Sequence, residues 1–371
     1  MYRYCGPLFE GFYIAIDSDG RVVCSCRDDQ NSLTMTLGRV PGSSLYDIWH
    51  GEKAESIREM FRQNTPPELC LNCPFILHTD DKRKLYRTIK TPYMVFLETN
   101  STCNLKCKRC DRERIIKNRE RAHMPLEDYK AIINDLNTLE YFKVLTLYNF
   151  GEPFMHKDIY DMLLFNRAKA PFINVNISTN GLLLDSKEKQ RIVAATVDQI
   201  IFSIDGSSEQ SYIQYREGGV FEKAYNNMAS LANEKRQAAS DIDIIWRYLL
   251  FRWNDSDEEL QRAIELSEKA GVRLYWHITS IPPGAPSLKY TIDDEIYTPK
   301  IKGRLWIEHP YGVLNVKRNG YDPRKWERIT AQGVSDYFAR YKKGNEAPAA
   351  KSVGIARKYF SMLRDRLNKR D

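Results

Sequence analysis

Cys103-Asn104-Leu105-Lys106-Cys107-Lys108-Arg109-Cys110 places three cysteines within eight residues, directly after the apolar run 93–97. Three thiolates can hold three irons of a 4Fe-4S cube, whereas a cluster used only for electron transfer normally has a fourth thiolate. The spacing therefore predicts a cluster whose fourth iron is open to another ligand.

The octapeptide resembles the signature of the radical S-adenosylmethionine (radical SAM) superfamily. In that family the open iron chelates the amino and carboxylate groups of the cofactor S-adenosylmethionine (SAM). The resemblance implies that Cys103, Cys107 and Cys110 hold the cluster. It also implies cleavage of SAM to a 5′-deoxyadenosyl radical, which abstracts a hydrogen atom from an unactivated carbon. Many members place an aromatic residue against adenine just before the third cysteine; here Arg109 stands there and could stack on the purine.

Two other uses of the triplet fit less well. Structural zinc sites usually have four ligands and pair their cysteines as Cys-x2-Cys from separate turns. Disulfides are disfavoured because residues 1–5 contain no apolar signal segment, which predicts a reducing cytoplasm. We therefore expect the 8 cysteines to bind metal in a cytoplasmic protein.

Composition predicts a globular enzyme. The 371 residues are 42% hydrophobic, enough for a large core, and no apolar run has membrane-spanning length. The net charge of +7 is moderate and spread along the chain. We expect an acidic flavodoxin- or ferredoxin-type electron donor as a partner, and neither a membrane nor nucleic acid.

Short β-branched runs alternate with helical stretches from residue 93 to 278, which predicts β-α units around a parallel sheet. The expected strands are 93–98, 144–148, 173–178, 199–204, 242–250 and 272–278. The expected helices are 126–139, 159–169, 187–195, 220–238 and 257–270. The last helix begins with a capping box, Ser256-Asp257-Glu258-Glu259, and ends at Gly271. The predicted fold class is α/β, with a partial (β/α)6 barrel of the TIM type.

In a parallel barrel the chemistry gathers at the carboxyl ends of the strands. Gly151-Glu152-Pro153 follows the second expected strand, 178–181 closes the third and 203–206 closes the fourth. Glu152 could accept hydrogen bonds from the methionine ammonium group, and Gly151 lets the backbone come close to the ligand. These segments resemble the cofactor motifs of the family.

The same resemblance implies further cofactor contacts and leaves the substrate contacts open. Ser178, Asn180 and Ser203 have short polar side chains that suit the ribose hydroxyls, and Arg216 could pair with the methionine carboxylate. Asp205 completes the expected set of cofactor contacts. Arg247, Tyr275 and His277 lie near the ends of the fifth and sixth strands and are the candidate catalytic residues. Strand alternation predicts that not all three face inward, and His277 could equally be a core residue.

Residues 1–78 contain the other five cysteines, Cys5, Cys24, Cys26, Cys70 and Cys73. The run 14–23 predicts a β-hairpin with Asp19-Gly20 at its turn, and Ser44 is expected to open a helix. This order resembles the auxiliary-cluster domain called SPASM, or its shorter form, twitch. Radical SAM enzymes normally carry that domain after the barrel, so its position here indicates a circular permutation.

Five cysteines are too few for the two auxiliary clusters of a full SPASM domain. The resemblance therefore implies one auxiliary 4Fe-4S cluster, held by Cys5, Cys26, Cys70 and Cys73. Cys24 is then spare, although it shares a strand face with Cys26. A four-cysteine zinc site is the alternative.

The expected domain boundaries are 1–78 for the auxiliary unit, 79–91 for a basic linker, 92–280 for the barrel and 281–371 for a C-terminal extension. The stretch 352–370 has apolar residues on one side and basic residues on the other. Such a helix usually docks on its own domain, and binding to a partner is the alternative.

The fate of the substrate radical separates the possible reactions. A dehydrogenase passes the second electron to the auxiliary cluster, an epimerase needs a thiol to return a hydrogen atom, and a peptide cross-linking enzyme forms a new bond first. Because only Cys24 is unassigned, we favour dehydrogenation of a small polar metabolite such as a sugar or aminocyclitol. Cross-linking or epimerisation of a ribosomally made peptide, or epimerisation of a small molecule, is the alternative. A non-catalytic iron-sulfur or zinc protein would have no use for Glu152 and an open iron.

Overall fold

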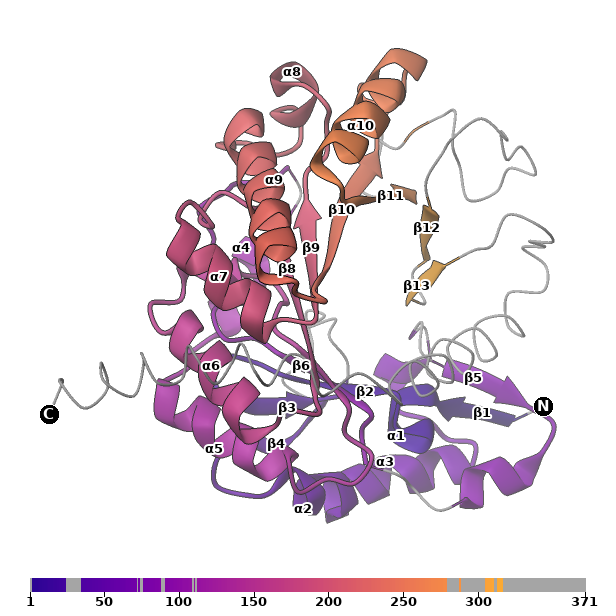
Figure 1. The fold of residues 1–371 in the computed structure, drawn as a ribbon. Coiled ribbons are helices and arrows are strands. Elements are labelled where there is room, and N and C mark those ends of the chain that lie inside the picture. Colours follow the sequence, from indigo (N-terminus) through magenta and orange to yellow (C-terminus); the bar gives the residue numbers. More distant parts are fainter. Residues whose placement is uncertain are drawn as a thin grey trace, which may run out of the picture.

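The computed structural model describes residues 2–24, 35–71, 73, 76–87, 91–108, 110, 112–278, 287, 304–309 and 312–315. Helices cover one face of a long sheet, and the N-terminal elements lie at one end of the barrel (Figure 1). Among the described helices, none combines the length and the apolar character needed to cross a bilayer.

One sheet of eleven strands organises the described part of the chain, in the order β13-β12-β11-β10-β9-β8-β7-β6-β2-β3-β4. The six strands that the sequence predicts are β6 (Met94–Leu97), β7 (Val144–Thr146), β8 (Asn174–Thr179), β9 (Gln199–Ser203), β10 (Asp243–Leu250) and β11 (Arg273–Ile278). They are parallel neighbours in sequence order, which confirms the α/β barrel.

The sheet extends beyond these six strands at both ends. Strand β12 (Arg304–His309) joins β11 in parallel, and β13 (Gly312–Asn315) joins β12 antiparallel. At the other end β2 (Tyr13–Ile16) joins β6 in parallel, and β3 (Arg21–Val23) and β4 (Thr36–Arg39) continue antiparallel. Part of the C-terminal extension therefore belongs to the sheet. The predicted helix over 352–370 lies outside the described residues.

The predicted helices form on the outer face of the sheet. They are α5 (Leu126–Leu136), α6 (Ile159–Lys169), α7 (Lys187–Thr196), α9 (Phe221–Ala238) and α10 (Asp257–Ala270), with the short α4 (Arg112–Ile115) and α8 (Glu209–Tyr212) between them. Alternating apolar strand residues pack beneath them; Trp246 of β10, for example, is fully buried and contacts Tyr225 of α9. Burial of such a side chain contributes roughly 1.5–3 kcal/mol.

The start of α10 differs from the predicted capping box. Ser256 accepts a hydrogen bond from the Glu259 amide, and Gly271 ends the helix with a positive φ of 71°, as expected. The Glu259 carboxylate, however, accepts hydrogen bonds from the hydroxyls of Ser207, Ser208 and Ser211. Three hydroxyl donors therefore hold this side chain at α8 and the loop before it, and Glu259 connects two β-α units.

The N-terminal unit is built from short elements. Strands β1 (Tyr2–Cys5) and β5 (Ile76–Thr79) form a separate antiparallel pair, and the helices are α1 (Gly6–Glu10), α2 (Leu45–His50) and α3 (Glu52–Arg62), with 3-10 turns at Glu68–Cys70 and Lys82–Tyr86. Ser44 caps α2, as predicted. Within the segment expected to be a linker, Leu85 is fully buried and its carbonyl accepts a hydrogen bond from Arg62.

Candidate functional site

The cysteine loop after β6 is held against a second loop of the barrel. The Lys106 amide donates to the Glu217 carbonyl at 3.0 Å, and the Lys108 amide donates to the Tyr215 carbonyl at 3.0 Å. These two bonds hold the loop beside the segment that follows α8. The backbone around the cysteines is therefore fixed by a part of the chain more than a hundred residues away.

Polar groups converge on the sulfurs of this loop. The Leu105 amide lies 3.5 Å from Cys103 Sγ, Arg216 Nη1 lies 3.5 Å from Cys107 Sγ, and Asn180 Nδ2 lies 4.0 Å from Cys103 Sγ. Burial raises the pKa of the Cys103 thiol to about 11 and also raises the pKa of Cys110. A metal would displace these protons, and the surrounding donors suit the thiolates that result. The loop therefore fits a cluster held by Cys103, Cys107 and Cys110.

Glu152 connects the ends of β7 and β8 beside this loop. Its carboxylate accepts hydrogen bonds from Thr179 Oγ1 at 2.6 Å and from the Asn180 amide at 2.7 Å. Burial raises its pKa to about 7. A side chain at Gly151 would lie 2.1 Å from the Asn100 carbonyl oxygen, so only glycine allows this close approach. The expected contact of Glu152 with the methionine ammonium group stays a prediction.

Asp205 and Arg216 form a buried ion pair next to the cysteine loop. Arg216 Nε lies 2.6 Å from Asp205 Oδ2, and Asp205 Oδ1 accepts a hydrogen bond from the Leu249 amide at 2.8 Å. Arg216 therefore braces the loop through Asp205 and Cys107. The expected contact of Arg216 with the methionine carboxylate stays a prediction. Arg109 lies outside the described residues.

A hydrogen-bonded row crosses the face of the sheet opposite the helices. Ser178 Oγ lies 3.3 Å from Ser203 Oγ, which accepts a hydrogen bond from Arg247 Nη2 at 2.7 Å. Arg247 is opposite Ser203 on one side and Tyr275 on the other. The row lies on the concave face because Trp246, the residue before Arg247 in β10, packs under α9.

The register corrects one expectation about the candidate catalytic residues. Tyr275 and Arg247 are directly opposite each other, and His277 lies two residues further along the same strand. All three are therefore on the concave face, contrary to the prediction that they cannot all face inward. The prediction failed because alternation applies within one strand, whereas the register between strands is set by their pairing. Tyr275 and His277 are both buried.

The N-terminal unit brings four other cysteines together. The neighbouring thiols of Cys24, Cys70 and Cys73 act electrostatically on Cys5, whose pKa is raised chiefly by burial and also by these three groups. Cys24, expected to be spare, is therefore one of the group. Cys26 lies outside the described residues. Among the described side chains, no three from His, Cys, Asp and Glu are placed to hold one metal ion.

The hairpin turn of the N-terminal unit is hydrogen-bonded to the segment that follows the radical-cluster loop. Asp19, which is fully buried, accepts hydrogen bonds from the amides of Glu120 and Arg121 at 2.9 and 2.7 Å. Arg21 Nη2 donates to the Asn118 carbonyl at 2.7 Å, and Ser18 Oγ donates to the Arg121 carbonyl at 2.8 Å. We call these contacts of 17–21 with 118–121 the hairpin clasp.

A buried ion network lies beneath the clasp. Arg119 lies 2.7 Å from Glu98 at the end of β6 and 3.5 Å from Asp17. Asn149, two residues before Gly151, donates to Glu98 at 3.0 Å. The network thus reaches from the N-terminal hairpin to the loop that carries Glu152. This network was not predicted from the sequence, although the charged turn 17–21 within an apolar hairpin was an available signal.

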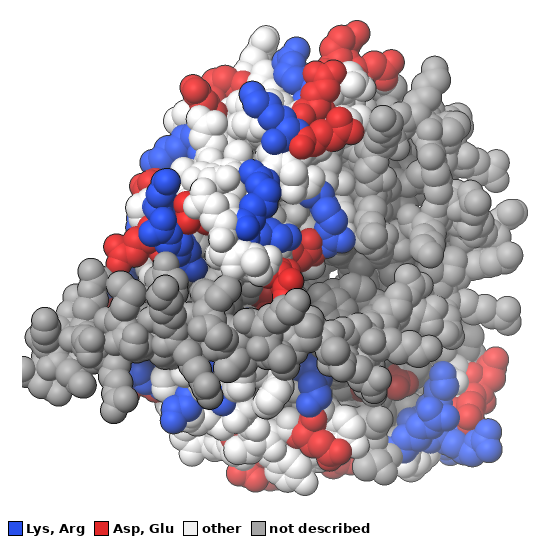
Figure 2. Space-filling view, viewed as in Figure 1, with Lys and Arg blue, Asp and Glu red and all other residues white. Residues whose placement is uncertain are grey.

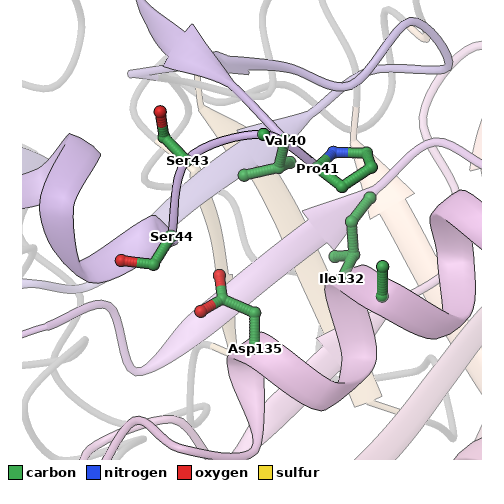
Figure 3. A pocket seen from close by; sticks show the side chains of 8 residues that line it. Val40, Pro41, Ser43, Ser44, Ile132 and Asp135 are labelled. Atoms are coloured by element: carbon green, nitrogen blue, oxygen red, sulfur yellow. The ribbon is translucent and has the colours of Figure 1, made fainter.

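A surface pocket of about 290 Å³ lies away from both cysteine groups, between the β4–α2 turn and α5 (Figure 3). Its lining includes Ser44, Ile132 and Asp135. Asp135 accepts a hydrogen bond from the Leu45 amide at 2.7 Å, so the group joins α5 to the start of α2. We assign this pocket no catalytic role.

Comparison with known families agrees with these two cysteine sites. The model of the radical SAM superfamily matches residues 97–262, and the model of the SPASM iron-sulfur cluster-binding domain matches residues 5–74. The chain belongs to the radical SAM superfamily. Its SPASM domain stands before the radical SAM domain, as the order of motifs predicts.

Relatives of this radical SAM protein are distant. The AdoMet-dependent heme synthase of Nitratidesulfovibrio vulgaris is 25% identical over 198 residues, which are 51% of this chain and 48% of the relative. The mycofactocin maturase of Mycolicibacterium smegmatis is 24% identical over 147 residues, 40% of this chain and 36% of the relative. The chain thus aligns with half or less of the length of these relatives. The crystal structure of Streptococcus suis SuiB, 15% identical, superposes with a TM-score of 0.43 over 91% of this chain and 69% of SuiB.

Proposed function

We propose that this radical SAM enzyme dehydrogenates a small polar metabolite such as a sugar or aminocyclitol, using one auxiliary 4Fe-4S cluster as the acceptor of the second electron. When bound, the reduced cluster and SAM supply a 5′-deoxyadenosyl radical that removes one hydrogen atom. An auxiliary cluster held by the N-terminal cysteines would supply the acceptor for the second electron, and the accompanying proton would go to solvent. The product is oxidised by two electrons overall.

The position of the two cysteine groups on one sheet carries the proposal. The radical loop follows the carboxyl end of β6, whereas Cys24 follows β3 and lies opposite the first half of β2. Four-residue strands such as β2 and β6 span about 13 Å. The concave face lies beside this strand pair, so a substrate bound there would be near both groups. Polar side chains at the row of Ser178, Ser203 and Arg247 suit a polar ligand.

The expected electron donor stays part of the proposal. We infer an acidic flavodoxin- or ferredoxin-type protein because the chain has a net charge of +7. Figure 2 shows Lys and Arg interspersed with Asp and Glu over the helical face, with no single basic patch there.

Replacing auxiliary cysteines tests the electron acceptor. Cys70→Ala with Cys73→Ala should stop substrate oxidation while the cleavage of SAM to 5′-deoxyadenosine continues, because the radical loop is untouched. Liquid chromatography with mass detection would follow both products in the anaerobically reconstituted enzyme, with extracts of the source cells as substrate. Undiminished oxidation in this variant would reject the proposal. Solvent deuterium in the product would identify an epimerase instead.

A matched pair of single variants identifies the fourth auxiliary ligand. We expect Cys24→Ser to lose about four of about eight irons, because Cys24 lies with Cys5, Cys70 and Cys73, and we expect Cys26→Ser to keep them. Iron and sulfide analysis after reconstitution measures this. Loss of the cluster only in Cys26→Ser would restore the ligand set expected from the family spacing. Stoichiometric zinc with only four irons would reject an auxiliary cluster altogether.

A further inference from the structure

The hydrogen-bonded row on the concave face ends at a guanidinium with few partners. Arg247 Nη2 donates to Ser203 Oγ, while its Nε is shielded from solvent and has no hydrogen-bond partner among the described residues. An arginine has five N–H donors, and among the described residues only Ser203 accepts a hydrogen bond from Arg247. This partner in the described part of the chain is a hydroxyl, which carries no charge.

The acidic side chains near Arg247 are paired elsewhere. Asp205 forms its ion pair with Arg216. Asp243, four residues earlier on the same face of β10, pairs with Arg273 and also accepts a hydrogen bond from Gln199. Among the described residues, no carboxylate lies within ion-pairing distance of Arg247. A partly buried cation without an anion is unfavourable, so the site is prepared for a negative ligand.

The depth of Arg247 distinguishes it from the residues around the cysteine loop. The Leu249 amide donates a hydrogen bond to Asp205. Arg247 is opposite Ser203, which lies two residues before Asp205 and therefore further from the carboxyl ends of the strands. A ligand bound to Arg247 would therefore lie closer to the amino-terminal ends of the strands than the Asp205–Arg216 pair does. Asn176 is on the same face of β8, and its buried side-chain oxygen has no hydrogen-bond partner among the described residues. The concave face thus carries a cation without an anionic partner, Arg247, and a separate acceptor without a donor, the Asn176 side-chain oxygen, among the described residues.

We propose that Arg247 binds a carboxylate of the substrate, which identifies the substrate as a small polar acid, such as a sugar acid, that also carries a hydroxyl or amino group. This assignment rests on the proposed function in placing the substrate on the concave face. A guanidinium binds a carboxylate through two parallel hydrogen bonds, which a neutral sugar cannot form. SAM also carries a carboxylate, so the test must separate the two sources.

Acetate is the probe for this site. Thermal unfolding of the reconstituted full-length protein is measured against acetate at constant ionic strength, with and without saturating SAM. We expect acetate to raise the melting temperature of the wild type in both conditions. In Arg247→Gln the affinity for acetate should fall about tenfold or more, as expected for loss of a charge-assisted pair. The control Arg262→Gln removes an exposed arginine on α10 and should behave as the wild type.

Two further variants separate binding from structure. Arg247→Lys should keep part of the acetate effect, because the charge remains. Ser203→Ala should keep most of it, because it removes the hydroxyl that accepts a hydrogen bond from Arg247 but leaves the guanidinium. An equal acetate effect in the wild type and Arg247→Gln, or none in the wild type, would overturn the proposal.

The measurements with SAM decide whether Arg247 binds the carboxylate of the substrate or that of SAM. If Arg247 serves the substrate, Arg247→Gln leaves the dissociation constant of SAM unchanged, measured by equilibrium dialysis. Loss of the acetate effect on adding SAM, together with weaker SAM binding in Arg247→Gln, would assign Arg247 to the cofactor and overturn the proposal. These readouts need no turnover, so a failure of the dehydrogenase assignment would leave them intact.

Discussion

The barrel cysteines and the N-terminal cysteines occupy two ends of one strand pair, but different interactions surround them. The barrel loop has a backbone amide, a side-chain amide and a guanidinium within 4.0 Å of its sulfurs. In the N-terminal unit, the pKa of Cys5 is raised chiefly by burial and then by the neighbouring thiols. Donors near the sulfurs stabilise a charged, ligand-accessible cluster, whereas burial among thiols suits a closed one.

The two regions are also joined more tightly than two separate domains would be. Strand β2 pairs with β6 along four residues, and the hairpin clasp holds the segment after the radical-cluster loop. The N-terminal unit therefore completes the barrel wall as well as carrying its own cysteines. A permuted domain can be absorbed in this way because adding a parallel strand satisfies the exposed backbone groups of an edge strand.

The largest effect should come from breaking the barrel site alone. Replacing Cys103, Cys107 and Cys110 together by Ala should abolish SAM cleavage, because three cluster ligands are lost. The N-terminal cluster should remain, with about four of about eight irons retained. Iron analysis and electron paramagnetic resonance of the reduced protein measure this. If all iron were lost, the two sites would depend on each other for assembly.

Breaking the connection between the regions should have the next largest effect. Asp19→Ala leaves two partly buried amides without their acceptor, which should lower the free energy of unfolding by about 3 kcal/mol. Arg39→Ala is the matched control, since its ion pair with Glu120 is exposed and should be worth less than about 1 kcal/mol. Urea unfolding compares the two. Equal, small losses would show that the clasp does not hold the regions together.

The smallest expected effect concerns the pH dependence of cofactor binding. Because burial raises the pKa of Glu152 to about 7, the side chain is partly protonated at neutral pH in the metal-free protein. If its carboxylate binds the methionine ammonium group, SAM affinity should rise by up to about tenfold from pH 6 to pH 8, following deprotonation. The affinity of Glu152→Gln should be lower and nearly independent of pH. A pH-independent affinity in the wild type would argue against this contact.

The same carboxyl group links pH to folding in the metal-free chain. Its pKa is above that of an exposed glutamate, so the folded state binds this proton more tightly than the unfolded state. The resulting stability is present at low pH and is lost as the pH rises through about 7. Glu152→Gln should remove that part of the pH dependence.

The barrel was predictable because its signals are local. Apolar periodicity, caps and glycine stops placed β6 to β11 and the covering helices close to their observed bounds, and Gly271 ends α10 as expected. The cysteine triplet, Glu152 and Asn180 were identified as a group because parallel strands bring their carboxyl ends to one edge. Patterns within about ten residues carry this information in the chain itself.

Pairing between distant segments was decided by the tertiary structure. The sequence identified a hairpin over 14–23, but only the fold placed β2 beside β6 and Asp19 against 118–121. It placed Arg247, Tyr275 and His277 on one face through the register of β10 with β11. The fold also directed Glu259 to three serines rather than to its own helix start. Each of these choices depends on which partner gains more hydrogen bonds and burial, and that competition cannot be read from one segment alone.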